Sequence, residues 1–371
     1  MAYALGANPG KSPNANTFTS DIGSETRLAT SGEFSSYLTE QIFEQSAMIQ
    51  SGLLAVDARM NNVTGVLVEL PFFAPLNYNE EVLDSSSTWG DQGKGVLTWQ
   101  KQTASTQYGV FTNRTAGFSM DDLSQVETGE DSLANISSQL VPDMNRKLTA
   151  KVISQLSGLF DTALASHVVT VGAEEDAVDD LTEANFLSAG AVTQAKARLG
   201  ERGNTLTVLV CHSAVAYHMQ NLGMLTFQNA GGTVNYASNG VGITNTQVGY
   251  FAGMQVVIDD QVPVTTTASK TPVYTCYLAQ PGVIRTGGQY PLTIEYARSL
   301  DTWTNQMAVK YNTCHHVLGT TFAGSPTTGL SNANLATGSN WAAAFSDTRL
   351  IPLMQLDVNS PYGGVNPAAL P

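Results

Sequence analysis

Residues 131–160 read DSLANISSQLVPDMNRKLTAKVISQLSGLF, and this stretch decides the fold that we expect. Its large apolar side chains recur every three or four residues, which places them on one face of a helix. They are Leu133, Ile136, Leu140, Met144, Leu148, Val152, Leu156 and Leu159. Asp131 and Ser132 are suited to cap the first turn, and a rise of about 1.5 Å per residue gives a helix roughly 45 Å long.

Pro142 lies inside this predicted helix. Proline removes one backbone N–H donor and crowds the carbonyl four residues earlier in the chain. We therefore expect a kink near residues 138–141, or two helices placed end to end. In either form the apolar face indicates a helix that packs against a hydrophobic core.

The chain before the helix begins as a polar arm. Residues 1–31 are rich in Asn, Ser, Thr and Gly, a composition typical of an arm or tail. Residues 6–12 resemble a phosphate-binding loop but are one residue short of the motif, and no hydrophobic strand precedes them. Residues 33–49 then carry apolar side chains at helical spacing, which predicts a short helix.

A long β-ribbon is predicted between the arm and the helix. Residues 63–70 alternate in polarity, and a second strand returns through residues 96–118 after a polar turn. Residues 100–107 have almost nothing apolar to bury, and an isolated two-stranded ribbon is marginal in water. We therefore expect the ribbon to lie on a neighbour, with Trp89 and Trp99 as anchors.

After the long helix the sequence predicts short strands mixed with helices, which is an α+β pattern. The predicted helices span residues 181–199, ending at Gly200, and 213–219, capped by Ser213. The predicted strands span residues 205–210, 254–258, 273–279, 292–296 and 306–318. Residues 226–248 are rich in Asn and Gly and are predicted to be a loop, and the last 48 residues are polar with two apolar islands.

The composition indicates a surface that other protein covers. Charged residues make up only 13% of the 371 residues, against about 25% in a typical soluble domain. Charge is costly to strip of water, so surfaces buried between proteins are depleted in it. A subunit whose surface is mostly interface therefore fits this chain, and a secreted polar β-rich protein is the alternative that the composition also permits.

Charge and cysteine content exclude other classes. The net charge is −14 and the 17 Lys and Arg residues are scattered, which argues against a dedicated nucleic-acid binder. Cys211, Cys276 and Cys314 form no CxxC pair, so we expect free thiols made in a reducing cytoplasm. No basic-then-apolar signal peptide opens the sequence, and no apolar run approaches the roughly 20 residues of a membrane span.

The sequence offers only weak candidates for chemistry. Cys314 and His316 would share one face of a strand, but no other His or Cys has matching spacing for a metal site. His212, Ser213 and Asp259 or Asp260 supply the residue types of a hydrolytic triad without the GxSxG motif. Carboxylate pairs at residues 174–175 and 179–180 are predicted to be solvated. We therefore expect no catalytic residue, cofactor or metal.

The order of elements resembles the major capsid proteins of tailed double-stranded DNA bacteriophages, which have the Hong Kong 97 type fold. The match covers about 260 residues and rests on TLTVLVCHS at 205–213, GMQVVIDD at 253–260, YLA at 277–279 with GVI at 282–284, and EYAR at 295–298 leading to Gly319 and Phe322. The ribbon and the long helix precede these segments in the order that the family shows.

This resemblance implies a division of the chain into parts. Residues 1–50 would be the N-terminal arm and 51–118 the extended β-hairpin loop. Residues 119–204 and 285–323 would form the peripheral domain, with residues 131–160 as its spine helix. Residues 205–284 would form the axial domain at the capsomer centre, with the loop over 226–248 facing the five-fold or six-fold axis. Residues 324–371 would be a C-terminal extension that clamps neighbouring subunits or docks a cement protein.

The resemblance also implies partners and contact residues. Copies of the chain would assemble as pentamers and hexamers into an icosahedral head that encloses double-stranded DNA by weak contacts. A portal protein, a separate scaffolding protein and a decoration protein are expected partners, and the virion is the expected location after assembly in the bacterial cytoplasm. The candidates for contact between subunits are Trp89, Lys94, Trp99, Lys101, Tyr108 and Trp341, with Lys94 and Lys101 also candidates for cross-linking.

Two alternatives remain open at this point. An encapsulin-like nanocompartment would have the same fold but would hold enzyme cargo, and particles with and without DNA distinguish it from a phage head. A secreted hydrolase using His212 and Ser213 belongs to another class, would be a monomer, and would lose its activity with Ser213→Ala.

Overall fold

The computed structural model describes residues 51–61, 65–73, 101–102, 104–121, 132–224, 226–227, 249–265, 267, 270–290, 292–299, 303–326 and 329–362. Several predicted features lie outside these residues. They are the arm over residues 1–50, most of the 226–248 loop and the part of the ribbon between residues 74 and 100.

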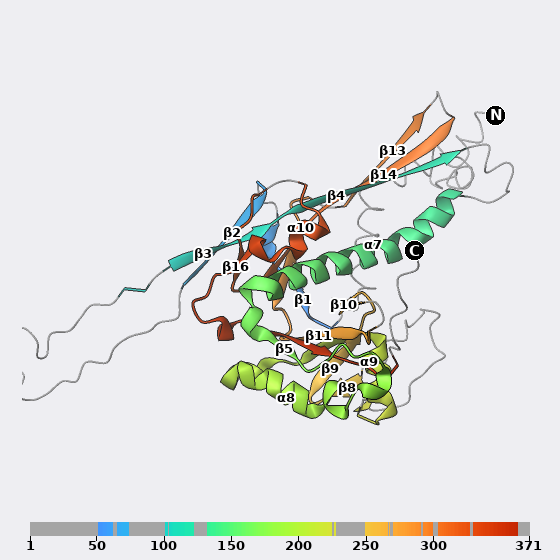
Figure 1. The fold of residues 1–371 in the computed structure, drawn as a ribbon. Helices are drawn as coiled ribbons and strands as arrows, with labels where there is room; N and C mark the ends of the chain where they lie inside the picture. The colour runs from blue at the N-terminus through green and yellow to red at the C-terminus, as the bar shows by residue number, and fades with distance from the viewer. Residues whose placement is uncertain are drawn as a thin grey trace, which may run out of the picture.

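The long helix is present as α7, Ser132–Gly158, which runs diagonally across the molecule (Figure 1). It continues into a π-helical turn, Leu159–Ala163. Pro142 lies inside α7, and the helix continues through it without a break, so of the two predicted alternatives the pair of helices placed end to end is wrong. Packing holds the helix on both sides of Pro142, because Leu140 and Val141 are buried in the first half and Val152 and Leu156 in the second.

A long antiparallel sheet runs beside α7. Its upper part consists of β4 (Thr112–Asp121), β14 (Thr304–Val317) and β13 (Thr293–Ser299), with β14 in the middle. Its lower part pairs β14 with β12 (Ile284–Gly287), which pairs in parallel with β1 (Leu54–Val56). Met307 and Val309 on β14 are buried with Leu140 and Val141 of α7, so one face of this sheet packs on the helix.

A second sheet forms the lower module of the molecule (Figure 1). Among the described residues it has eight strands, of which seven run in the order β5, β17, β11, β6, β9, β8 and β7. Their bounds are Val168–Thr170, Leu353–Val358, Val273–Ala279, Val208–Cys211, Met254–Ile258, Gly249–Phe251 and Thr226–Phe227. The eighth strand, β10 (Val264–Thr265), pairs with β11.

This sheet is covered on both faces. Helices α8 (Ala189–Arg198) and α9 (Ser213–Asn221) share one buried cluster with Leu209, Leu278 and Leu356 of the sheet. Alternate residues of the same strands, including Val208 and Leu353, join a different cluster with the C-terminal end of α7. Alternation along the strands therefore sends successive side chains into two separate cores.

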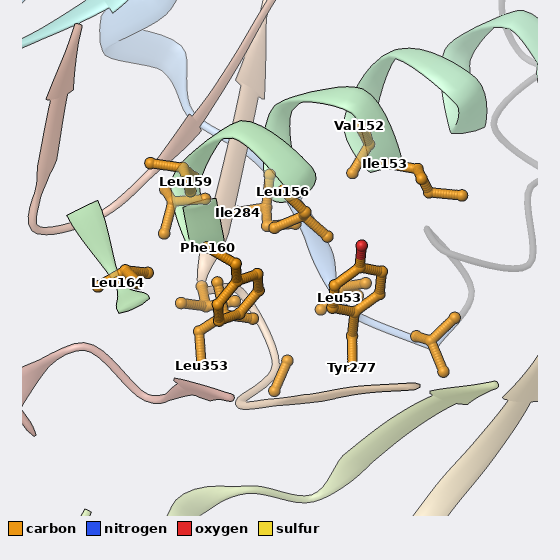
Figure 2. Close-up of a cluster of buried hydrophobic side chains, with 14 of the residues drawn as sticks. Leu53, Val152, Ile153, Leu156, Leu159, Phe160, Leu164, Tyr277, Ile284 and Leu353 are labelled. Atoms are coloured by element: carbon orange, nitrogen blue, oxygen red, sulfur yellow. The ribbon is translucent and has the colours of Figure 1, made fainter. Parts of the chain in front are cut away.

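The second of these cores joins α7 to the eight-stranded sheet. Figure 2 shows Leu156 and Phe160 of the helix and its following turn above Tyr277 and Leu353 of the sheet. The rings of Phe160 and Tyr277 stack with centroids 5.7 Å apart and an interplanar angle of 17°. Stacked rings add about 0.5–1.5 kcal/mol beyond the area that they bury. The spine helix and the lower module are therefore one packed body.

The ribbon differs from its prediction in one respect. Its first strand is β2 (Leu67–Phe73), which pairs with β3 (Ala104–Val110) in the register Leu67 to Val110 and Phe73 to Ala104. The predicted single return strand is divided at Phe111, because β4 leaves the ribbon and pairs with β14. Phe111 is buried in a cluster with Met60, Val68, Leu70 and Cys314, and this burial fixes the point where the chain changes sheets.

The predicted helix over residues 181–199 is shorter in the structure. Glu183–Asn185 is a single 3-10 turn, which Thr182 and Asn185 close by reciprocal side-chain hydrogen bonds. The α-helix then starts at Ala189, where the Ser188 hydroxyl accepts a hydrogen bond from the Ala191 N–H at 3.2 Å. Polar side chains that bond to nearby backbone compete with helix formation, which explains the late start.

The C-terminal part is integrated into the body, which corrects the predicted division at residue 324. Strand β16 (Trp341–Ala343) pairs with β15 (Thr320–Phe322), and helix α10 (Asn332–Ala336) packs on α7. Strand β17 lies between β5 and β11, inside the module that was assigned to residues 205–284. Four of its six residues, Leu353, Met354, Leu356 and Val358, have no exposed surface, so the strand contributes to the core of the subunit itself.

Candidate functional site

The base of the ribbon is tied to the body by a buried side chain. Gln107 on β3 accepts a hydrogen bond from the Gly319 N–H at 2.9 Å through its Oε1 atom. The same oxygen lies 3.0 Å from Nε2 of His316, so His316 carries its proton on that nitrogen. Burial lowers the pKa of His316 to about 4, and the ring is therefore neutral at pH 7.

Two of the residues that were predicted to contact neighbouring subunits, Lys101 and Tyr108, lie on the described part of the ribbon. The Tyr108 N–H donates to the Thr321 hydroxyl at 3.0 Å, which links β3 to β15 within the same chain. Tyr108 is half-buried, whereas Lys101 is exposed. Trp89, Lys94 and Trp99 lie outside the described residues. Among the described candidates, Lys101 is thus the one whose side chain is exposed to other molecules.

Trp341 is not an exposed contact residue, which corrects its selection as a candidate. Its side chain is 2% exposed within the subunit. The indole N–H donates to the Leu335 carbonyl at 2.8 Å, and the ring meets Phe322 edge to face at 5.3 Å between centroids. The indole also lies against Gly158, where an added Cβ would come within 3.0 Å of it. Trp341 therefore fixes the C-terminal segment to α7.

Phe73 and Trp303 are exposed aromatic residues that were not among the predicted contact candidates. Phe73, at the end of β2, is 71% exposed. Trp303 precedes β14 in the hairpin with β13, and it is 63% exposed with the Arg298 guanidinium 6.0 Å from its ring centroid. Trp303 has a φ of 52°, which is unusual for a residue with a side chain and marks local strain. The turn was predicted, but a sequence alone does not show which of its aromatic residues is exposed.

The arrangement of His212 and Ser213 does not support a hydrolytic triad. His212 Nδ1 accepts a hydrogen bond from the Ala214 N–H at 3.1 Å, so His212 caps α9 and Ser213 does not. The Ser213 hydroxyl and the Asp260 carboxylate lie 3.4 and 3.7 Å from this same nitrogen. A triad needs the serine and the carboxylate on opposite ring nitrogens. The Asp260 carboxylate instead accepts the Ser213 N–H at 2.9 Å.

Metal chemistry finds no support in the described residues either. They contain no group of three or more His, Cys, Asp or Glu side chains placed to hold a metal ion. Burial raises the pKa of the Cys314 thiol to about 12, so the sulfur is protonated and a poor ligand. The acidic segment is held by ordinary contacts: the Thr267 hydroxyl donates to Glu174, and Lys270 pairs with Asp176 at 2.9 Å.

The membrane question is answered for the described helices. None of them has both the length and the apolar character that a membrane span requires.

Comparison with known proteins identifies the fold. No family model matches the chain. It is 24% identical over 334 residues to the major capsid protein of Bacillus phage SPP1, which covers 87% of this chain and 94% of that protein. The structure is similar to the capsid subunit of cyanophage Pam1, with a TM-score of 0.53, 8% identity, and coverage of 86% of this chain and 93% of that one. The chain has a Hong Kong 97 type capsid fold.

A second solved structure agrees with this capsid fold. The capsid of Ralstonia phage GP4 aligns with a TM-score of 0.51 and 10% identity, over 83% of this chain and 86% of that chain. The predicted α+β class and the predicted resemblance to phage major capsid proteins are therefore confirmed. The encapsulin alternative is not favoured by these comparisons.

Proposed function

We propose that this chain is the major capsid protein of a tailed double-stranded DNA phage, and that its function is assembly rather than catalysis. The observation that carries the proposal is the sequence match along 94% of a protein named as a major capsid protein, together with the capsid fold. A match of that extent includes the ribbon, the spine helix and the lower module, so it concerns the whole subunit and not one shared motif.

Pentamers and hexamers of the chain are the assemblies that we propose. The part of the ribbon beyond Phe73 and before Ala104, together with the arm over residues 1–50, would lie on neighbouring subunits, and residues 205–284 would lie around the capsomer axis. Interfaces of permanent assemblies commonly bury above ~2,000 Å². A chain with 13% charged residues has little charge to desolvate when such areas are covered.

The other partners of the subunit belong to the same proposal. A portal protein, a separate scaffolding protein and a decoration protein would complete the head, and packaged DNA would face a surface with few Lys and Arg. The net charge of −14 supports weak and non-specific contact with DNA. The virion would be the location of the assembled protein.

The test is electron microscopy of the purified full-length chain at increasing concentration. We expect closed shells with five-fold and six-fold capsomers. A compact monomer that remains monomeric at high concentration contradicts the proposal. Particles purified from phage-producing cells that contain enzyme cargo and no DNA would indicate the encapsulin alternative.

A variant with a shortened ribbon tests whether residues 74–103 are needed for assembly. Phe73 pairs with Ala104, so β2 and β3 can be joined by replacing residues 74–103 with Asn-Gly, a sequence suited to a two-residue hairpin turn. The buried contacts of Gln107 and Phe111 stay in place in this variant. We expect it to fold as a soluble subunit and to fail to form shells.

A further inference from the structure

Lys151 is a buried charged residue with an unusual position. It lies on α7, and its side chain is 2% exposed. Its Nζ donates to the Thr313 hydroxyl of β14, and it lies 5.3 Å from the centroid of the Tyr311 ring. The amine therefore sits between the spine helix and the central strand of the long sheet.

The groups around Lys151 do not include a counterion. Within the described part of the chain, no carboxylate forms an ion pair with its amine. The titratable and charged groups that act on it are Arg114 of β4, which repels it, and Cys314 of β14. On the same strand His315 is acted on by Lys151, and Tyr311 faces Arg114 and Asp143.

Such surroundings penalise the ammonium form. A charge taken out of water needs a paired charge or a full set of hydrogen bonds to repay its desolvation. One hydroxyl and one aromatic ring repay only part of this cost. Burial, with Arg114 as the second cause, accordingly lowers the pKa of Lys151 from 10.5 to about 7.

We propose that Lys151 is a proton-controlled latch: the neutral amine seats α7 against β14, and protonation favours separation of the helix from the strand. The latch acts within one subunit, and it does not depend on the proposed function. In a shell it would couple the proton concentration to the packing of the spine helix.

The direction and range of the effect follow from linkage. In the separated state Lys151 is in water and titrates near 10.5, whereas in the packed state it titrates near 7. Between these values the separated state binds one more proton than the packed state. The constant for separation therefore rises about tenfold for each unit of pH decrease from about 10 to 7, and it is level below pH 7.

Other groups titrate outside this window. Burial lowers the pKa of His315 to about 3, so it does not change its charge between pH 7 and 9.5. Burial raises the pKa of Tyr311 above its ordinary value, so it ionises at still higher pH. Burial raises the pKa of the Cys314 thiol to about 12, and a thiol exposed by separation titrates near 9, so Cys314 favours separation only at the alkaline end of this range. A measurement between pH 7 and 8.5 thus isolates Lys151 among the groups at this contact.

The experiment is hydrogen exchange of the full-length chain, read by mass spectrometry between pH 6 and 9.5. Exchange rates divided by the intrinsic rates give the constant for opening at residues 148–156 of α7 and 307–313 of β14. Residues 273–279 of β11, in the eight-stranded sheet, serve as an internal reference. We expect the opening constant of α7 and β14 to increase about tenfold per unit of pH decrease from 8.5 to 7, and that of β11 to change much less.

Two variants complete the test. Lys151→Met keeps the length of the side chain and removes the titrating group, so its opening constant should be independent of pH between pH 7 and 8.5. Lys310→Met changes the same residue type at an exposed position of β14 and should keep the wild-type profile. A flat wild-type profile overturns the proposal even if Lys151→Met does not fold, and so does a slope that persists in Lys151→Met or vanishes in Lys310→Met.

Discussion

The eight-stranded sheet and the long sheet bury their strands in different ways. All seven residues of β11 are buried, because helices cover one face of its sheet and the end of α7 covers the other. In the upper part of β14, Met307 and Val309 are buried against α7 while Gln306, Ala308 and Lys310 are exposed. The chain therefore completes its core in the lower module and keeps open surface along the long sheet.

The largest expected effect separates these two sheets directly. Leu356→Ala in β17 removes a side chain with no exposed surface and should cost about 3–4 kcal/mol in the free energy of unfolding. Gln306→Ala on the exposed face of β14 should change it by less than about 0.5 kcal/mol. Urea denaturation measures both values. Equal losses in the two variants would remove the distinction between a closed and an open sheet.

The next effect depends on pH and concerns the lower half of β14. His315 is buried with both ring nitrogens lacking a partner, and burial lowers its pKa to about 3. The unfolded chain binds this proton at higher pH than the folded chain, so stability falls as the pH falls from about 6.5 toward 3. His315→Leu should remove this loss. Between pH 6.5 and 4.5 its free energy of unfolding should therefore fall by about 2–3 kcal/mol less than that of the wild type.

Denaturation curves of both proteins at the two pH values test this prediction. His212 is partly exposed, and His212→Asn is the matched control because Asn can also cap α9. An acid sensitivity that is the same in His315→Leu and wild type would show that the buried ring does not control it.

The ribbon base provides the third comparison. Gln107→Ala leaves the buried Gly319 N–H and His316 Nε2 without their acceptor, which should cost about 2 kcal/mol. Hydrogen exchange should increase in β2, β3 and at Gly319, and stay unchanged in the eight-stranded sheet. Lys101→Ala on the same ribbon is exposed and should alter neither region. Faster exchange throughout the molecule would mean that the ribbon base and the lower module unfold together.

The smallest effect concerns Trp341. Trp341→Phe keeps an aromatic ring and loses the N–H that donates to the Leu335 carbonyl, so we expect a loss of about 1 kcal/mol in stability. Shell formation should be unchanged, since the side chain is covered within the subunit. If Trp341→Phe folds as well as the wild type but forms no shells, Trp341 is a contact residue between subunits.

Local patterns in the sequence predicted much of this fold. The period of three to four residues located α7 to within two residues at each end. The strands over residues 254–258 and 273–279 have the predicted bounds, because turn residues on both sides limit them. These features depend on neighbours in sequence, which is why the residues themselves reveal them.

Features that depend on distant contacts were not predictable in the same way. The two apolar islands of the last 48 residues were recognised, but nothing in them indicates that β17 pairs with β11, about 80 residues earlier. The burial of Trp341 and the exposure of Trp303 were missed for the same reason, since the residue type alone does not decide between a core and a surface. The change of sheet at Phe111 likewise follows from its tertiary cluster.

The position of β17 determines when the subunit can mature on the ribosome. Strands β5 and β11 are joined through β17, so the lower module stays incomplete until translation has passed residue 358. A nascent or prematurely terminated polypeptide lacks β17 and exposes the edges of β5 and β11 that this strand covers. A molecule whose synthesis stops before residue 358 therefore cannot form the finished module.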